Sequence, residues 1–222
     1  MKYVFEDLNK EIYDFVKSAN AQLSSDDRIF YSCNFISGKL NNPQYLFIGL
    51  NPGYDDKEWE DRPLLTYKSW SLVPVGKYYL KNALEDIFGS KILDESALVN
   101  LHPIATPDKT ILNTQTTNLG RLGLGEQYDK IKKNTLKTII EELKPKKIVC
   151  IGVQTFDLFK KIFKFEVDTK LTKKANGHRL YLQSKCIETF PNIYGIIHLT
   201  GARVLNSEKA ILKSCFNEEN NE

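Results

Sequence analysis

The sequence predicts an α/β protein, a three-layer α/β/α sandwich around a central, mainly parallel sheet of four strands. Short apolar runs recur along the chain, as expected for strands that are buried on both faces of a parallel sheet. Segments with apolar residues at helical spacing lie between these runs. Parallel strands are joined by crossovers, and the crossover helices then cover both faces of the sheet.

Each expected strand is an apolar run next to turn-forming residues. The run 45–50 follows the turn signal Asn41-Asn42-Pro43 and stops at an amide, a proline and a glycine. The run 97–101 leads into His102-Pro103, and the segment after it, rich in Thr, Asn and Pro, is expected to be a loop. The four expected strands are 45–50, 97–101, 147–152 and 194–198, and 30–35 is a short strand or an extended loop.

The segments between the strands carry the helical pattern. In 5–21, apolar residues recur every three or four positions, which predicts an amphipathic helix. Gly89 and Lys144-Pro145 mark the ends of two further helices. The long segment 51–74 contains two Trp and two Tyr, so we expect an ordered, functional loop there. The expected helices are 5–21, 77–88, 128–143, 155–163 and 206–216.

Length and composition set the domain organisation. The chain has 222 residues, of which 41% are hydrophobic and 27% charged, enough to bury one substantial core. We expect a monomer with a single domain over residues 1–222, in which 1–40 is an N-terminal helical extension and 43–216 the core. The chain contains no run of about eighteen apolar residues, the length needed to span a bilayer, and its start lacks the apolar stretch of a signal peptide. A cytoplasmic protein is therefore expected.

The cysteines indicate neither a metal site nor a disulfide. They are widely scattered, without a C-x-x-C pair, so we expect free thiols and neither a zinc nor an iron–sulfur site. No cofactor is expected. Cys150 stands inside an apolar run and is expected to be a buried packing residue. The four cysteines are Cys33, Cys150, Cys186 and Cys215.

The charge of the chain is unevenly distributed. The net charge is only +3, yet residues 130–185 contain fourteen Lys and one Arg against five acidic residues, or +10. The rest of the chain is then about −7. Such asymmetry suits a protein with one face toward a polyanion, although solvated helix faces would produce it equally well.

Polar side chains stand where three of the expected strands end. They are Asn51, Asn100 followed by His102, and His198. Carboxyl ends of parallel strands share one edge of a sheet, where ligands bind, so we expect these side chains to converge. Amides recognise donor and acceptor pairs on a planar heterocycle, and aromatic side chains stack on its face. An imidazole can donate to an oxygen that becomes negative during the reaction. The combination suits a nucleobase.

At these positions the chain resembles the uracil-DNA glycosylase superfamily. The segment 49–53, Gly-Leu-Asn-Pro-Gly, is similar to the first family motif in the form found in the mismatch-specific and single-strand-selective branches. The segment 100–103, Asn-Leu-His-Pro, resembles the middle motif of the single-strand-selective branch. His198 begins a segment that stands at the place of the last motif, with Leu199-Thr200 instead of Pro-Ser. The resemblance spans about residues 43–216.

The resemblance implies a monofunctional DNA glycosylase that removes uracil or a related modified base and leaves an abasic site. It implies that His198 donates to the oxyanion forming on the base, that Asn100 pairs with the base edge and that Asn51 positions the attacking water. The base pocket would also include Gly49, Gly53, Tyr54 and Trp70, with Tyr54 ranked before Trp70 and Tyr67 as the stacking aromatic. Contacts to DNA would come from Thr200, Gly201, Arg203 and Asn206, and Arg203 would fill the gap left by the flipped base. His102 would line the pocket or cover its wall.

Other classes of function fit parts of the sequence. A nucleotide-binding α/β protein lacks its usual glycine-rich signature here, and a serine hydrolase lacks G-x-S-x-G. The acidic residues between 55 and 61 suit either a metal-dependent nuclease or a solvated loop. The altered last motif suits a non-catalytic glycosylase-fold module that binds DNA or protein. A glycosylase for a modified phage base is a further alternative. His178, in a polar segment with Asn176-Gly177, is expected in a hairpin turn.

Overall fold

A computed structural model of the chain describes residues 2–31, 36–51, 79–106, 109–185, 190–199 and 204–218. The chain forms two compact units whose segments alternate along the sequence. The first comprises Met1–Phe35, Asn51–Tyr67 and Asn100–Glu142, and the second Ile36–Leu50, Lys68–Val99 and Leu143–Glu222. The expectation of a single domain with residues 1–40 as an extension stays a prediction. Among the helices of the described residues, none has the length and apolar character needed to cross a membrane.

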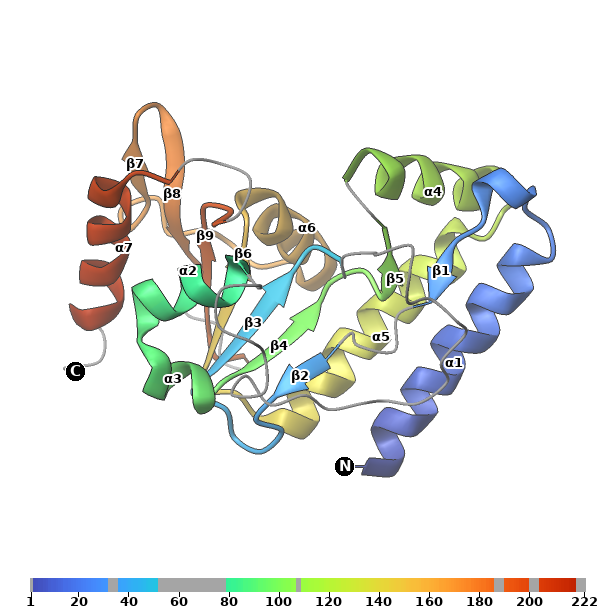
Figure 1. The fold of residues 1–222 in the computed structure, drawn as a ribbon, viewed down its shortest axis with the longest axis horizontal. Helices are drawn as coiled ribbons and strands as arrows, with labels where there is room; N and C mark the ends of the chain where they lie inside the picture. The colour runs from blue at the N-terminus through green and yellow to red at the C-terminus, as the bar shows by residue number, and fades with distance from the viewer. Residues whose placement is uncertain are drawn as a thin grey trace. The chain divides into compact units, whose positions relative to one another are not determined.

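The second unit contains a mixed sheet with helices on both faces (Figure 1). Its strands are β2 (Ile36–Gly38), β3 (Tyr45–Gly49), β4 (Ala97–Asn100), β6 (Lys147–Ile151), β7 (Lys173–Ala175), β8 (His178–Gln183) and β9 (Asn192–Ile196). Its helices are α2 (Tyr79–Phe88), α3 (Ser90–Asp94), α6 (Val153–Phe163) and α7 (Asn206–Glu218).

The sheet has seven strands in the order β2-β4-β3-β6-β9-β8-β7. β3 pairs with β6, and β6 with β9, in parallel. In Figure 1 β4 runs alongside β3 in the same direction. The outer strands β2, β8 and β7 pair with their neighbours in antiparallel. The α/β class with a mainly parallel sheet is confirmed. The expected strands 45–50, 97–101 and 147–152 correspond to β3, β4 and β6, whereas the strand expected at 194–198 lies two residues earlier, as β9. The sheet is larger than the four strands predicted, because β2 and β7 have only three residues each and the apolar run of β8 is only three residues long, Leu180 to Leu182.

Both faces of the central strands are buried. β3 is buried at all five positions. On one face Tyr45 and Phe47 join a core with α2 and α7, in which the Phe216 ring centroid lies 6.0 Å from that of Tyr45. On the other face α6 lies so close to β9 that a Cβ atom added at Gly195 would be 2.6 Å from the ring of Phe156. The apolar runs recognised in the sequence are therefore those that helices cover on both sides.

The first unit is mainly helical. Its elements are α1 (Lys2–Asn20), the short 3-10 helix η1 (Ser25–Asp27), β1 (Phe30–Tyr31), β5 (Ile104–Ala105), α4 (Lys109–Arg121) and α5 (Gly125–Leu143). β1 and β5 form a two-stranded antiparallel sheet. The buried residues of α1 include Phe5, Ile12 and Phe15, as the helical spacing predicted, and the ring of Phe15 stacks on that of Tyr128 at 5.6 Å.

Helix α4 corrects the loop that we expected after Pro103. Its sequence is rich in Thr and Asn, which have low helix propensity. Leu112, Gln115 and Leu119 nevertheless lie on one side of the helix and are buried. The side-chain amide of Gln115 also donates to the backbone oxygen of Arg28 at 3.1 Å. Burial and long-range hydrogen bonds thus stabilise a helix that local propensity disfavours.

Candidate functional site

The second unit presents one edge at which the parallel strands end. β3, β6 and β9 run in parallel, so their carboxyl ends lie at the same edge. Gly49 is the last residue of β3, Gly152 directly follows β6, and His198 is the second residue after β9. This edge is where open α/β sheets bind ligands.

His198 is exposed and lies against Gly152. A Cβ atom added at Gly152 would stand 3.3 Å from Cδ2 of His198 and 3.4 Å from Oγ1 of Thr155. Gly152 has φ +102°, donates its N–H to the oxygen of Ile196 at 2.8 Å and is the N-cap residue directly before α6. The glycine therefore leaves room for the imidazole beside the N-terminus of α6, where negative charge is favoured.

Leu199 directly follows His198, at the position where the motif that this segment resembles has a proline. It is 8% exposed and belongs to the hydrophobic core that α2 and α7 share with the sheet. A buried leucine anchors the chain through packing, whereas a proline would restrict its φ angle. The segment that carries His198 is thus attached to the core directly after the imidazole.

Asn51 is held by a residue far away in the sequence. Its side-chain nitrogen donates to Oγ1 of Thr106 at 2.8 Å and lies 3.4 Å from the backbone oxygen of Thr106. Because a carbonyl oxygen can only accept, the nitrogen must face Thr106, and Oδ1 is the accepting atom of this amide. Thr106 is 1% exposed. The contact gives the Asn51 side chain a defined orientation.

The imidazole of His102 is buried. Its Nδ1 lies 2.9 Å from the hydroxyl of Tyr128, and burial, together with the positive charge of Lys132, lowers the pKa of His102 to about 3. Burial also raises the pKa of Tyr128 well above its ordinary value. His102 is therefore neutral near pH 7 and supports the segment that follows β4. Asn100, the last residue of β4, is partly buried.

Of the remaining predicted site residues, the structure describes Asn206, which is the exposed first residue of α7. The N–H of Leu205, directly before it, donates to Oε2 of Glu208 at 2.9 Å, as in a capping box. Asn51 and Asn100 belong to the first unit and Gly49, His198 and Asn206 to the second. Their convergence stays a prediction. Outside the described residues lie Gly53, Tyr54, Tyr67, Trp70, Thr200, Gly201 and Arg203.

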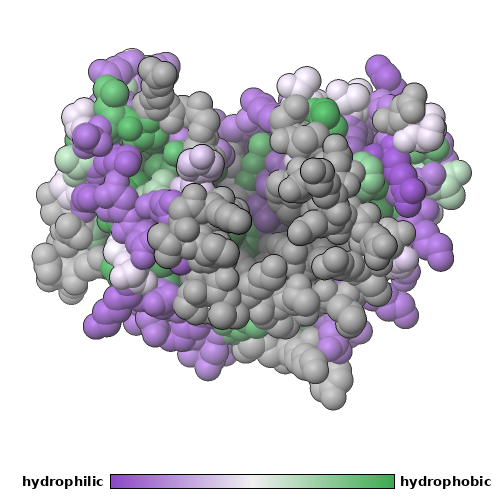
Figure 2. Space-filling model, viewed as in Figure 1, coloured by the Kyte–Doolittle hydropathy of each residue, from purple (hydrophilic) through white to green (hydrophobic). Residues whose placement is uncertain are grey.

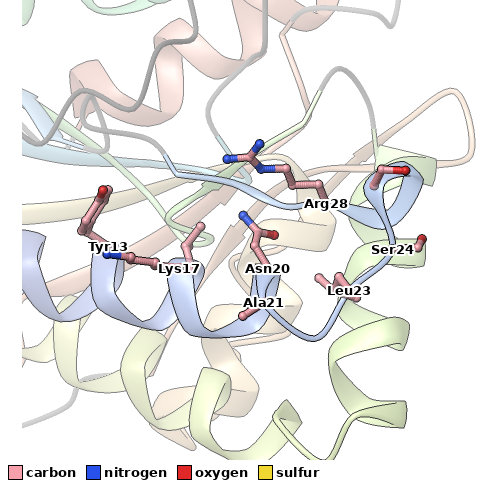
Figure 3. A pocket seen from close by; sticks show the side chains of 9 residues that line it. Tyr13, Lys17, Asn20, Ala21, Leu23, Ser24 and Arg28 are labelled. Carbon is pink, nitrogen blue, oxygen red and sulfur yellow. The ribbon is translucent and has the colours of Figure 1, made fainter.

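The first unit also contains a cavity of about 460 Å³ (Figure 3). None of the predicted site residues lines it. Asn20 on its wall exchanges two hydrogen bonds with the backbone of Ile29, at 2.8 and 2.9 Å, and so connects α1 to the segment after η1. The lining residues are Tyr13, Val16, Lys17, Asn20, Ala21, Leu23, Ser24, Ser25 and Arg28.

The described residues include two of the four cysteines, Cys150 and Cys215. In those ranges no three His, Cys, Asp or Glu side chains gather as a possible metal site. Cys150 is buried, as predicted, and burial raises the pKa of its thiol. Cys33 and Cys186 lie outside the described residues.

Sequence reasoning missed several residues that support the site. Thr106 orients Asn51, Tyr128 contacts His102, and Thr155 and Gly152 lie beside His198. Gly152 carried a recognisable signal, because a glycine that separates a buried strand from a helix often has a positive φ. Neither Thr106 nor Tyr128 carried such a signal, since each partner is distant in the sequence.

The chain was also compared with known proteins. It matches no protein-family model and no curated protein.

Proposed function

We propose that this protein is a monofunctional DNA glycosylase that hydrolyses the N-glycosidic bond of uracil or a related modified base and leaves an abasic site. The order of the sheet is the observation that carries the proposal. Asn100 is the last residue of β4, and Asn51 and His198 are the second residues after β3 and β9. All three strands belong to the central parallel part of the sheet. Motifs resembling those of uracil-DNA glycosylases thus follow strand ends at a ligand-binding edge.

The proposed reaction takes a nucleotide that has left the base stack. The bond between the sugar C1′ and the base nitrogen breaks, and its electron pair moves onto the base. An N–H of His198 donates a hydrogen bond to the base oxygen on which negative charge develops. The exposed imidazole beside Gly152 supports this assignment, because it is accessible to a ligand.

The attacking water adds its oxygen to C1′ and releases a proton to bulk solvent, from which the departing base anion takes up a proton, so the products are the free base and an abasic site. Asn51 would orient this water through Oδ1, since Thr106 holds the amide nitrogen at 2.8 Å. An amide is not a strong base, so Asn51 contributes orientation, not deprotonation. Asn100 would recognise the Watson–Crick edge of the base, for which an amide offers both a donor and an acceptor.

The test uses purified protein with single- and double-stranded oligonucleotides that each contain one uracil. Alkali converts an abasic site into a strand break, so a break at the uracil position is the expected result. Matched oligonucleotides with thymine at that position are the control, and hypoxanthine, xanthine and hydroxymethyluracil extend the substrates. The absence of breaks at all these bases would overturn the proposal for common lesions. Binding to the same DNA without breaks would favour a non-catalytic glycosylase-fold module.

A further inference from the structure

The hairpin formed by β7 and β8 rises at the same edge of the sheet as His198. β8 is antiparallel to β9, with Tyr181 opposite Ile196, and the N–H of Ile197 donates to the oxygen of Leu180 at 2.9 Å. Continuing this register places Arg179 level with His198. The turn between β7 and β8 then lies farther out, and Figure 1 shows the hairpin extending past the end of β9.

We call residues 173–179, the outer part of this hairpin, the basic hairpin. It contains Lys173, Lys174 and Arg179 and no acidic residue, and all three cations are exposed. Across the described part of the chain, neither lysine has an ion-pair partner. Lys174 stands opposite Arg179 in the strand pair, and Arg179 forms an ion pair with Asp157. Lys173 and Lys174 are therefore the cations of this surface to which a polyanion would bind.

Two contacts hold the basic hairpin in place. Arg179 binds Asp157 of α6 with nitrogen–oxygen distances of 2.7 and 3.2 Å. Asn176 donates from its side-chain nitrogen to Oε1 of Glu208 in α7 at 2.9 Å, and Glu208 is only 5% exposed. Asn176 and Gly177 have φ +50° and +78°, as in a tight two-residue hairpin turn. A surface held in this way loses less conformational entropy when it binds a ligand.

We propose that the basic hairpin binds the phosphate backbone of a DNA strand beside His198, with Lys173 and Lys174 as the contacting cations. The choice of DNA as the polyanion rests on the proposed function. Lysine and phosphate form sequence-independent contacts that position a strand, while recognition of the base stays with the site at the strand ends. The hairpin would therefore control affinity for DNA and leave the choice of base unchanged.

The experiment compares the salt dependence of DNA binding. The probe is a fluorescein-labelled duplex without any modified base, titrated with the full chain between about 50 and 200 mM NaCl. The test variant is Lys173→Gln/Lys174→Gln. The matched control, Lys161→Gln/Lys164→Gln, removes two exposed lysines at the other end of α6. Lys173→Arg/Lys174→Arg keeps the charge, and far-UV circular dichroism verifies that each variant is folded.

Each lost phosphate contact should make the slope of log K against log salt less negative by about 0.9, and lower the affinity at 0.1 M salt about eightfold. We expect a change of up to about 1.8 for the test variant, little change for the control and wild-type behaviour for the arginine variant. An unchanged slope in the test variant, an equal change in the control or a wild type that does not bind would each overturn the hairpin proposal. Salt-dependent binding through the hairpin without base excision would instead contradict only the proposed function.

Discussion

Replacing Gly152 by alanine tests whether this residue provides the space that His198 occupies. Gly152 has φ +102° and ψ +130°, a conformation that residues with a Cβ atom rarely adopt. The new Cβ atom would stand 3.3 Å from Cδ2 of His198, so the imidazole would have to move by a few tenths of an ångström. Gly152→Ala should therefore lower stability and displace His198.

The two effects have different sizes. Backbone strain of this kind costs about 1–3 kcal/mol, and each kcal/mol lowers the melting temperature of a chain this long by about 2–4 °C. The contact with His198 adds little to that loss, because Cδ2 belongs to an exposed side chain that can move away. The contact should instead displace the imidazole of His198, and this displacement should lower the rate of base excision.

Gly89→Ala is the matched control for this prediction. Gly89 also precedes a helix, with φ +84° and ψ +151°, but an added Cβ atom there has nothing within 4 Å. Both variants should melt at lower temperature, and only Gly152→Ala should shift the imidazole resonances of His198 in an NMR spectrum. The chain has three histidines, so His198→Gln assigns these signals. Unshifted His198 resonances in Gly152→Ala would refute the reasoning.

Three further predictions concern the reaction and the pH dependence of stability. His198→Ala should slow single-turnover excision by about 10²–10³-fold while DNA affinity changes little, because the lost hydrogen bond acts on developing charge. Asn51→Ala should slow excision with base binding nearly intact, and Thr106→Val, which removes the acceptor 2.8 Å from the Asn51 nitrogen, should cause a smaller loss of the same kind. The pKa of His102 is lowered to about 3, so the unfolded chain, with an ordinary His pKa, binds an extra proton below about pH 6.5. In urea titrations, the contribution of His102 to the free energy of unfolding should be complete above about pH 6.5. It should decrease toward pH 3 by up to about 1.4 kcal/mol per pH unit, and His102→Gln should remove this pH dependence.

Particular outcomes would contradict these three predictions. Equal losses of excision and of DNA binding in His198→Ala would indicate that the imidazole only supports the structure. A Thr106→Val variant as slow as Asn51→Ala would show that Thr106 itself takes part in the reaction. Identical pH dependence in wild type and His102→Gln would mean that burial of His102 does not govern acid stability.

Elements that depend on local sequence patterns could be predicted, whereas elements stabilised by residues far apart in the sequence could not. The strands 45–50 and 147–152 were recognisable because burial on both faces requires a continuous apolar run. Helix α4 was missed because the side chains that stabilise it are distant: Gln115 contacts the backbone of Arg28, and Asn118 donates to Asp27 at 2.8 Å. A hairpin turn was expected at His178; the turn lies directly before it, at Asn176-Gly177 with their positive φ angles, and His178 is the first residue of β8.

The same distinction applies to the candidate site. The position of Asn51 after a buried strand was evident in the sequence, but its partner Thr106 is 55 residues away. His102 was expected in or over the pocket, and only the tertiary structure shows that it is buried, that burial lowers its pKa, and that it contacts Tyr128. Hydrogen-bond partners of this kind depend on packing between elements, which no local pattern encodes.

The sequence by itself determined the α/β class, the four central strands and the presence of Asn51, Asn100 and His198 at strand ends, because strand and helix periods are local properties of the chain. The tertiary structure decided the strand order β4-β3-β6-β9, the antiparallel outer strands and the space that Gly152 leaves for His198. These features arise from contacts between residues far apart in the chain. Such contacts form only when the helices cover the sheet and bury both of its faces.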